Sequence, residues 1–68
     1  MTKSEQSAVS RARRHAKVAP DLAAATLATL HRSARTQRSQ REIQQAIDDE
    51  CLSQYLVRVN GALVPRTA

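Results

Sequence analysis

Residues 21–41, DLAAATLATLHRSARTQRSQR, constrain the fold of this chain more than any other stretch. Ala23, Leu27, Leu30 and Ala34 follow one another at spacings of four, three and four. On a helix these residues lie within about 60° of arc. Alternating small and large residues along such a narrow face favour close packing of one helix on another. The stretch therefore predicts a central helix and an all-α fold built around it.

The second half of the same stretch places an arginine at every third position: Arg32, Arg35, Arg38 and Arg41. On one continuous helix they would wrap about half-way round, and Arg41 would lie beneath the apolar face. The helix must therefore end before Arg41. Ser39-Gln40-Arg41-Glu42 fits the S-x-x-E capping box of a new helix. We expect the second helix over about 21–37 and the third over about 40–58.

Two interpretations are open for the end of the third helix. Its first apolar face ends with Ile47 and Cys51, and the apolar residues from Leu52 onward lie on a different face. Either the helix continues to residue 58 and ends at Asn60-Gly61, or residues 55–59 and 62–64 form a hairpin about that Asn-Gly pair. We favour the helix, because a lone two-stranded ribbon is marginally stable.

The N-terminal segment is predicted to form a basic helix over about 4–18, with a thin apolar stripe that includes Ala8, Val9 and Ala12. Pro20 ends this segment, because the residue before a proline avoids helical backbone angles. The whole chain, 1–68, is expected to be a single small helical domain of three helices. In it residues 1–19 form a basic arm or helix and residues 60–68 a tail.

The size of the chain limits how stable it can be alone. A core built from 68 residues supplies about 3–5 kcal/mol at most. The single cysteine cannot form an internal disulfide, and one free thiol fits a reducing, cytoplasmic compartment. We therefore expect a homo-oligomer or an obligate partner. The predicted oligomer interface consists of the apolar faces of the second and third helices: Ala23, Leu27, Leu30, Ala34, Ile43 and Ile47.

Charge is distributed unevenly along the chain. The formal net charge is +5, and residues 1–41 hold nine Lys/Arg against two acidic residues. Such a bias is typical of proteins that bind polyanions, and it also suits docking on an acidic protein. If the first two helices fold back on each other at Pro20, two cationic clusters would flank one face. The predicted phosphate-contacting residues are Arg11, Arg13, Arg14, Lys17, Arg32, Arg35, Arg38 and Arg41.

Other function classes find little support in the sequence. A single glycine excludes the usual phosphate-binding loops, and His15 and His31 have no carboxylate or cysteine at a metal-site or catalytic spacing. We therefore expect no enzyme activity, no cofactor and no metal. The absence of aromatic residues other than Tyr55 disfavours single-strand binding. No apolar run approaches the roughly 18 residues of a membrane-spanning helix. Binding to a membrane surface is a third option, but the basic helix offers only Ala and Val to lipid, so no membrane partner is expected.

The first hypothesis is thus a small non-enzymatic regulator that binds duplex DNA or structured RNA. A helix-turn-helix over residues 27–47 is disfavoured, because Arg32, Thr36 and Arg38 occupy positions that should be apolar. The alternative is an inhibitor or adaptor that docks its helices on a larger, acidic protein.

The first thirteen residues resemble the start of the Rop-type plasmid copy-number regulators. The similarity consists of Met1-Thr2-Lys3, Glu5, Ala8 and Ala12-Arg13. It implies a dimeric four-helix bundle that binds RNA. Pro20 interrupts the long first helix of that fold, and the aromatic residue that the family uses for RNA is absent. The resemblance therefore illustrates a dimeric helical regulator of this size and does not define this chain.

Overall fold

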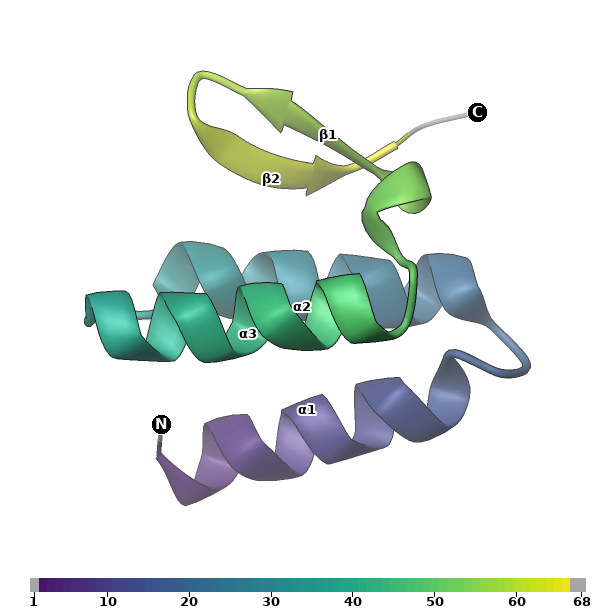
Figure 1. Cartoon of the computed structure of the whole chain (residues 1–68), viewed down its shortest axis with the longest axis horizontal. Helices are drawn as coiled ribbons and strands as arrows, with labels where there is room; N and C mark the ends of the chain where they lie inside the picture. The colour runs from purple at the N-terminus through teal and green to yellow at the C-terminus, as the bar shows by residue number, and fades with distance from the viewer. Residues whose placement is uncertain (1, 67–68) are drawn as a thin grey trace.

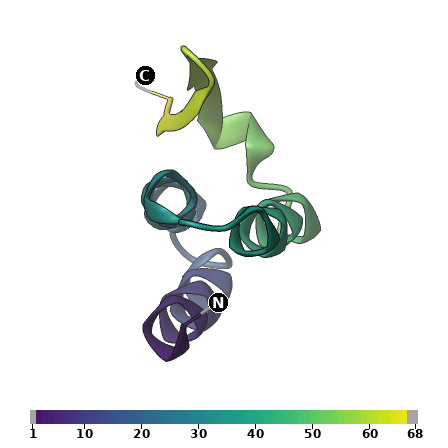
Figure 2. The ribbon, with the colours of Figure 1, turned by 90° about the vertical axis from the view of Figure 1, so that its left-hand side faces the viewer.

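The computed structural model describes residues 2–66 and arranges them in three layers (Figure 1). α2 and α3 form the middle layer, α1 lies on one side of it, and a β-hairpin lies on the other, as the end-on view confirms (Figure 2). The fold is a small helical domain with a short two-stranded antiparallel sheet, so the all-α prediction is correct only for the helices. The elements are α1 (Lys3–His15), α2 (Pro20–Ser33), α3 (Gln37–Asp49), the 3₁₀ turn η1 (Ser53–Tyr55), β1 (Leu56–Val59) and β2 (Ala62–Pro65).

α2 is the central element of the domain. It contacts α1, α3, η1 and both strands. Pro20 occupies its first turn, where the missing N–H has no helical partner to lose. The predicted face is buried at Ala23 and Leu27, and α2 also buries Ala24 and Ala28, each at most 1% exposed. Because small side chains line two sides of α2, the neighbouring helices and the hairpin can pack closely against it from more than one direction.

The break between α2 and α3 falls earlier than predicted. The chain leaves α2 at Ala34, which is extended, and Thr36 is the N-cap of α3. The Thr36 hydroxyl accepts a hydrogen bond from the backbone N–H of Ser39 at 3.1 Å. Ser39 is itself buried in the first turn of α3. The prediction that the helix ends before Arg41 is confirmed, whereas the capping box at Ser39 is wrong because Thr36 already caps the helix.

α3 ends at Asp49, so the predicted continuation to residue 58 is wrong. The backbone N–H of Leu52 donates to the Ile47 carbonyl at 2.9 Å, and that of Cys51 donates to the Asp48 carbonyl at 3.1 Å. This pair of bonds is a Schellman motif, which closes a helix around a residue in the left-handed region. Here that residue is Cys51, with φ 55. The turn buries Leu52 and leaves Cys51 exposed. The sequence pattern had instead predicted that Cys51 lies on the buried face of the helix.

The C-terminal segment forms the hairpin that we had considered as the alternative. Asn60 and Gly61 make its two-residue turn, with φ 51 and 82, and Val59 is paired with Ala62. Leu56 and Leu63 are 8% and 6% exposed and belong to the core. Packing on α2 supplies the stability that an isolated ribbon lacks. Much of the predicted tail, 60–68, is therefore strand β2, and residues 67–68 lie outside the described residues.

α1 is slightly shorter than predicted and buries the expected stripe. Thr2 caps it by accepting a hydrogen bond from the backbone N–H of Glu5 at 3.2 Å. Ala8, Val9 and Ala12 are buried. Because α1 ends at His15, the long first helix of the Rop-type fold is not formed. Among residues 2–66, no helix combines the length and the apolar character needed to cross a membrane.

The residues predicted to form an oligomer interface lie in the core of the single chain. α1 and the hairpin cover the apolar faces of α2 and α3 that the sequence assigned to a second copy. A homo-oligomer of this fold would have to form through other surfaces. Ala23, Leu27, Ala34, Ile43 and Ile47 are buried, and Leu30 is half-buried against them.

A basic groove beneath the hairpin

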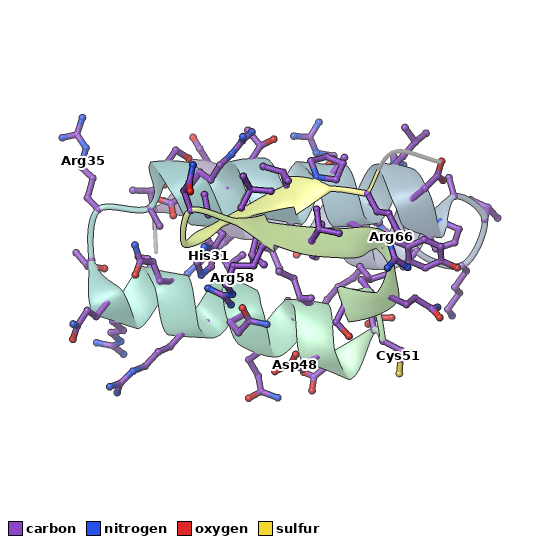
Figure 3. All side chains as sticks on the ribbon, turned by 90° about the horizontal axis from the view of Figure 1, so that it is seen from above. His31, Arg35, Asp48, Cys51, Arg58 and Arg66 are labelled. Carbon is purple, nitrogen blue, oxygen red and sulfur yellow. The ribbon has the colours of Figure 1, made fainter. Side chains whose placement is uncertain are left out.

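An open groove of about 780 Å³ lies where the hairpin passes over the end of α2 and the first half of α3. Figure 3 shows Arg58 and His31 close together beneath the ribbon. Among the described residues that line this groove, none is acidic. We call it the basic groove. α2 contributes His31 and Arg32; α3 contributes Gln37, Gln40, Arg41 and Gln44; the hairpin contributes Arg58, Asn60, Gly61 and Ala62.

The fold explains why basic side chains meet here. His31 and Arg32 lie in the last turn of α2, where the helix dipole favours positive charge. Arg41 is exposed on α3. Arg58 is the cross-strand partner of Leu63, so both side chains leave the ribbon on the face that covers the helices. Three elements therefore direct cations into one space.

The Arg58 side chain helps to shape the tip of the hairpin. Its Nη1 donates a hydrogen bond to the Gly61 carbonyl at 3.4 Å. This long bond leaves most of the five guanidinium donors for other partners. The backbone of Arg58 is thus fixed in β1, while most of its guanidinium N–H donors are available in the groove.

The electrostatic environment of His31 reflects the excess of positive charge. Partial burial, and secondly the positive charge of Arg58, lower the pKa of His31 below its usual value. His31 is therefore mainly neutral near pH 7. The positive charge of the groove then comes from Arg32, Arg41 and Arg58, and a bound anion would relieve their mutual repulsion.

Six of the eight predicted phosphate-contacting residues lie outside the groove. Three of these six pair with carboxylates of the chain or point away from it. The Arg13 guanidinium pairs with Asp49 at 3.0 Å and lies 3.9 Å from Glu50. Arg38 pairs with Glu42 at 3.6 Å on the surface of α3. Arg35 lies in the α2–α3 loop and points away from the rest of the chain (Figure 3).

The remaining predicted residues of the basic arm, Arg11, Arg14 and Lys17, are exposed on α1 and in the turn that follows it. The layer of α2 and α3 separates α1 from the hairpin (Figures 1 and 2). The two arginine clusters therefore do not share one face. Of the eight residues, the groove brings together Arg32 and Arg41.

His31 and Arg58 were missed as groove residues. The favoured helix over 40–58 did not predict that Arg58 would lie near α2. The alternative hairpin about Asn60-Gly61 held the necessary signal, because a ribbon alternates its faces and so would place Arg58 on the same side as Leu56. Recognising the hairpin would have identified the third arginine of the site.

The side chains that line the groove are basic or amide-bearing, apart from Gly61 and Ala62. Cys51 lies beyond the end of α3 and away from His31 (Figure 3), so the thiol and the imidazole do not form a nucleophile–base pair. Within residues 2–66, no three His, Cys, Asp or Glu side chains are grouped closely enough to hold a metal ion. Comparisons of the chain with protein-family models, curated proteins and solved structures give no match.

Proposed function

We propose that this chain is a small non-enzymatic regulator that binds nucleic acid through phosphate contacts in the basic groove. The observation that carries the proposal is the convergence of Arg32, Arg41 and Arg58 from three elements on a space whose described lining is free of carboxylates. Guanidinium groups stay charged at all physiological pH values and donate two parallel hydrogen bonds to a phosphate.

The other lining residues suit nucleic acid in particular. Gln37, Gln44 and Asn60 bring amide groups to the same groove, and amides can reach phosphate oxygens as well as base edges. The hairpin projects from the domain with Asn60-Gly61 at its exposed tip. A two-stranded ribbon is narrow enough to enter the major groove of duplex DNA. Duplex DNA and structured RNA are both candidate ligands.

The helix arrangement favours this mode over a helix-turn-helix. α2 and α3 run side by side and nearly parallel in axis in both views (Figures 1 and 2). A helix-turn-helix crosses its two helices at about 90–120° so that the second projects into the major groove. In this fold the hairpin, rather than α3, is the projecting element.

A second candidate is an inhibitor or adaptor that docks on an acidic protein. Val59 is 50% exposed on the same strand as Arg58. An apolar side chain beside an arginine is a common composition for a protein interface. Val59 leaves the ribbon on the face opposite Arg58, so an acidic partner that meets the groove would have to reach around the hairpin to cover this apolar surface as well. In either case the exposed free thiol of Cys51 supports a reducing, cytoplasmic location.

Fluorescence anisotropy with a labelled DNA duplex and a labelled RNA hairpin, titrated across salt, tests the proposal. Arg41→Gln/Arg58→Gln removes two charges from the groove, and Arg35→Gln/Arg38→Gln removes two charges outside it. We expect the groove variant to lose at least about tenfold in affinity, because a hydrogen bond to a charged group contributes about 1.5–3 kcal/mol. Its salt slope should fall by about two, one for each lost phosphate contact.

The control variant should lose much less affinity. Equal losses in the two variants would mean that overall charge, and not the groove, attracts the nucleic acid. Absence of binding to both ligands at low salt would overturn the proposal. The acidic-protein alternative would then account for the groove.

A further inference from the structure

The outer face of α1 carries a second cationic surface that the groove does not explain. It forms an open depression of about 580 Å³ in which none of the described lining residues is acidic. Three of these residues are cationic, and the others are small or amide-bearing hydrogen-bond donors. We call this surface the α1 stripe: Lys3, Gln6, Ser7, Ser10, Arg11 and Arg14.

The α1 stripe faces directly away from the rest of the domain. The buried side of α1 consists of Ala8, Val9 and Ala12. At 100° per residue, the centre of the stripe lies about 180° from the centre of that buried side. α1 itself lies across the α2–α3 layer from the hairpin (Figures 1 and 2). A straight duplex held in the basic groove therefore cannot also reach the stripe.

No acidic residue lines the stripe itself, although Glu50 shares a neighbouring depression with Arg14 at its end. Asp49 and Glu50 gather around Arg13, on the flank of α1 that faces the end of α3. Glu5 lies in the first turn of α1, where its Oε1 accepts a hydrogen bond from the Thr2 hydroxyl at 3.2 Å. Neither surface, the stripe or the groove, contains a carboxylate among its described lining residues.

The length of the stripe matches a run of phosphates. From Lys3 to Arg14 the helix rises about 16 Å. One strand of B-DNA carries a phosphate every 3.4 Å or so along its axis. Because the strand also winds around that axis, a straight stripe of this length faces a few of its phosphates. Serine, glutamine, lysine and arginine side chains are the usual donors to phosphate oxygens.

We propose that the α1 stripe is a second phosphate-binding surface and that one molecule of this protein bridges two nucleic-acid segments. The inference rests on the proposed function, because the basic groove holds the first segment. The two surfaces face opposite directions, so the second segment belongs to another duplex or to a distant part of the same one.

A bridging assay tests this inference. Two duplexes, one carrying a donor fluorophore and the other an acceptor, are mixed with the protein at low salt. We expect energy transfer with the wild-type chain and with the control variant Arg35→Gln/Arg38→Gln. Arg11→Gln/Arg14→Gln should lose the energy transfer, whereas a single duplex should still bind through the groove in the anisotropy assay, so that adding Arg41→Gln/Arg58→Gln weakens this remaining binding further.

The outcomes separate the two proposals. Binding of a single duplex without energy transfer by the wild-type chain would overturn the bridging inference and leave the proposed function intact. Energy transfer retained by Arg11→Gln/Arg14→Gln would also overturn it, because a dimer joining two grooves would then be the bridge. Absence of any binding would overturn the proposed function and the inference with it.

Discussion

The guanidinium of Arg13 lies 3.0 Å from the carboxylate of Asp49, although 36 residues separate the two in the sequence. The pair joins α1 to the end of α3. Both side chains are about half exposed, at 45% and 44%. An ion pair in such a setting contributes about 0.2–1 kcal/mol and weakens as salt rises. Arg13 therefore has a carboxylate partner within the chain, whereas Arg58 and Arg32 of the groove donate to a backbone carbonyl and to a hydroxyl.

The first prediction concerns this pair. We expect Arg13→Gln and Asp49→Asn each to lower the free energy of unfolding by up to about 1 kcal/mol, with a coupling of about 0.2–1 kcal/mol in the double-mutant cycle. Urea denaturation at low and high salt measures both quantities. Arg13→Gln should also change duplex affinity less than Arg41→Gln does. A larger effect of Arg13→Gln on binding would assign Arg13 to the nucleic-acid surface.

The second prediction concerns the residue that ends α3. Cys51 adopts φ 55, a left-handed conformation that costs a residue with a Cβ about 1–2 kcal/mol. Cys51→Gly removes this cost and adds some flexibility to the unfolded chain, so we expect a net gain of up to about 1 kcal/mol. Thermal unfolding followed by circular dichroism measures the gain.

Cys51→Ala is the matched control for this substitution. It removes the same exposed thiol and keeps the Cβ. Equal stabilisation by alanine and glycine would trace the effect to the thiol instead of the backbone.

The third prediction concerns the centre of the core. Leu27 is completely buried. Leu27→Ala should cost about 2–5 kcal/mol, which approaches the whole stability available to a domain of this size. We expect the variant to be largely unfolded at 25 °C by circular dichroism. Leu22→Ala, at a side chain that is 63% exposed, should change stability by about 0.5 kcal/mol or less. Equal effects at the two positions would contradict the packing of α2 described above.

The sequence pattern predicted the local features of this fold more accurately than the long-range ones. The central helix follows from the spacing of Ala23 and Leu27, and the break before Arg41 follows from its charge. The course of the chain after Asp49 depends on a cap without glycine and on the docking of the hairpin against α2. Those stabilising contacts are distant in sequence, and so a helix to residue 58 was locally the better choice.

The same reason explains the partial prediction of the candidate site. Arginine-rich segments were evident from composition, but which arginines come together depends on the three layers. Arg32 and Arg41 meet because α2 and α3 are neighbours, and Arg58 joins them only through the hairpin. Arg11 and Arg14 belong to α1, which lies on the other side of the α2–α3 layer from the hairpin (Figure 2).

The fourth prediction concerns pH. Burial, and then the charge of Arg58, lower the pKa of His31 in the folded chain, whereas the unfolded chain retains the ordinary value of about 6.5. As pH falls below that value, the unfolded chain takes up a proton more readily. The stability associated with neutral His31 is therefore fully present above about pH 6.5 and is lost as pH falls toward the folded pKa.

Urea denaturation of the wild-type chain and of His31→Gln, measured between about pH 7.5 and 5, checks this expectation while the carboxylates stay largely ionised. The free energy of unfolding of the wild-type chain should decline more steeply toward acid than that of His31→Gln. Arg58→Gln should reduce the difference, because it removes one of the three arginines that share the groove with His31. Identical pH profiles for the wild-type chain and His31→Gln would mean that the imidazole titrates alike in the folded and unfolded states, and that the groove exerts no net electrostatic effect on it.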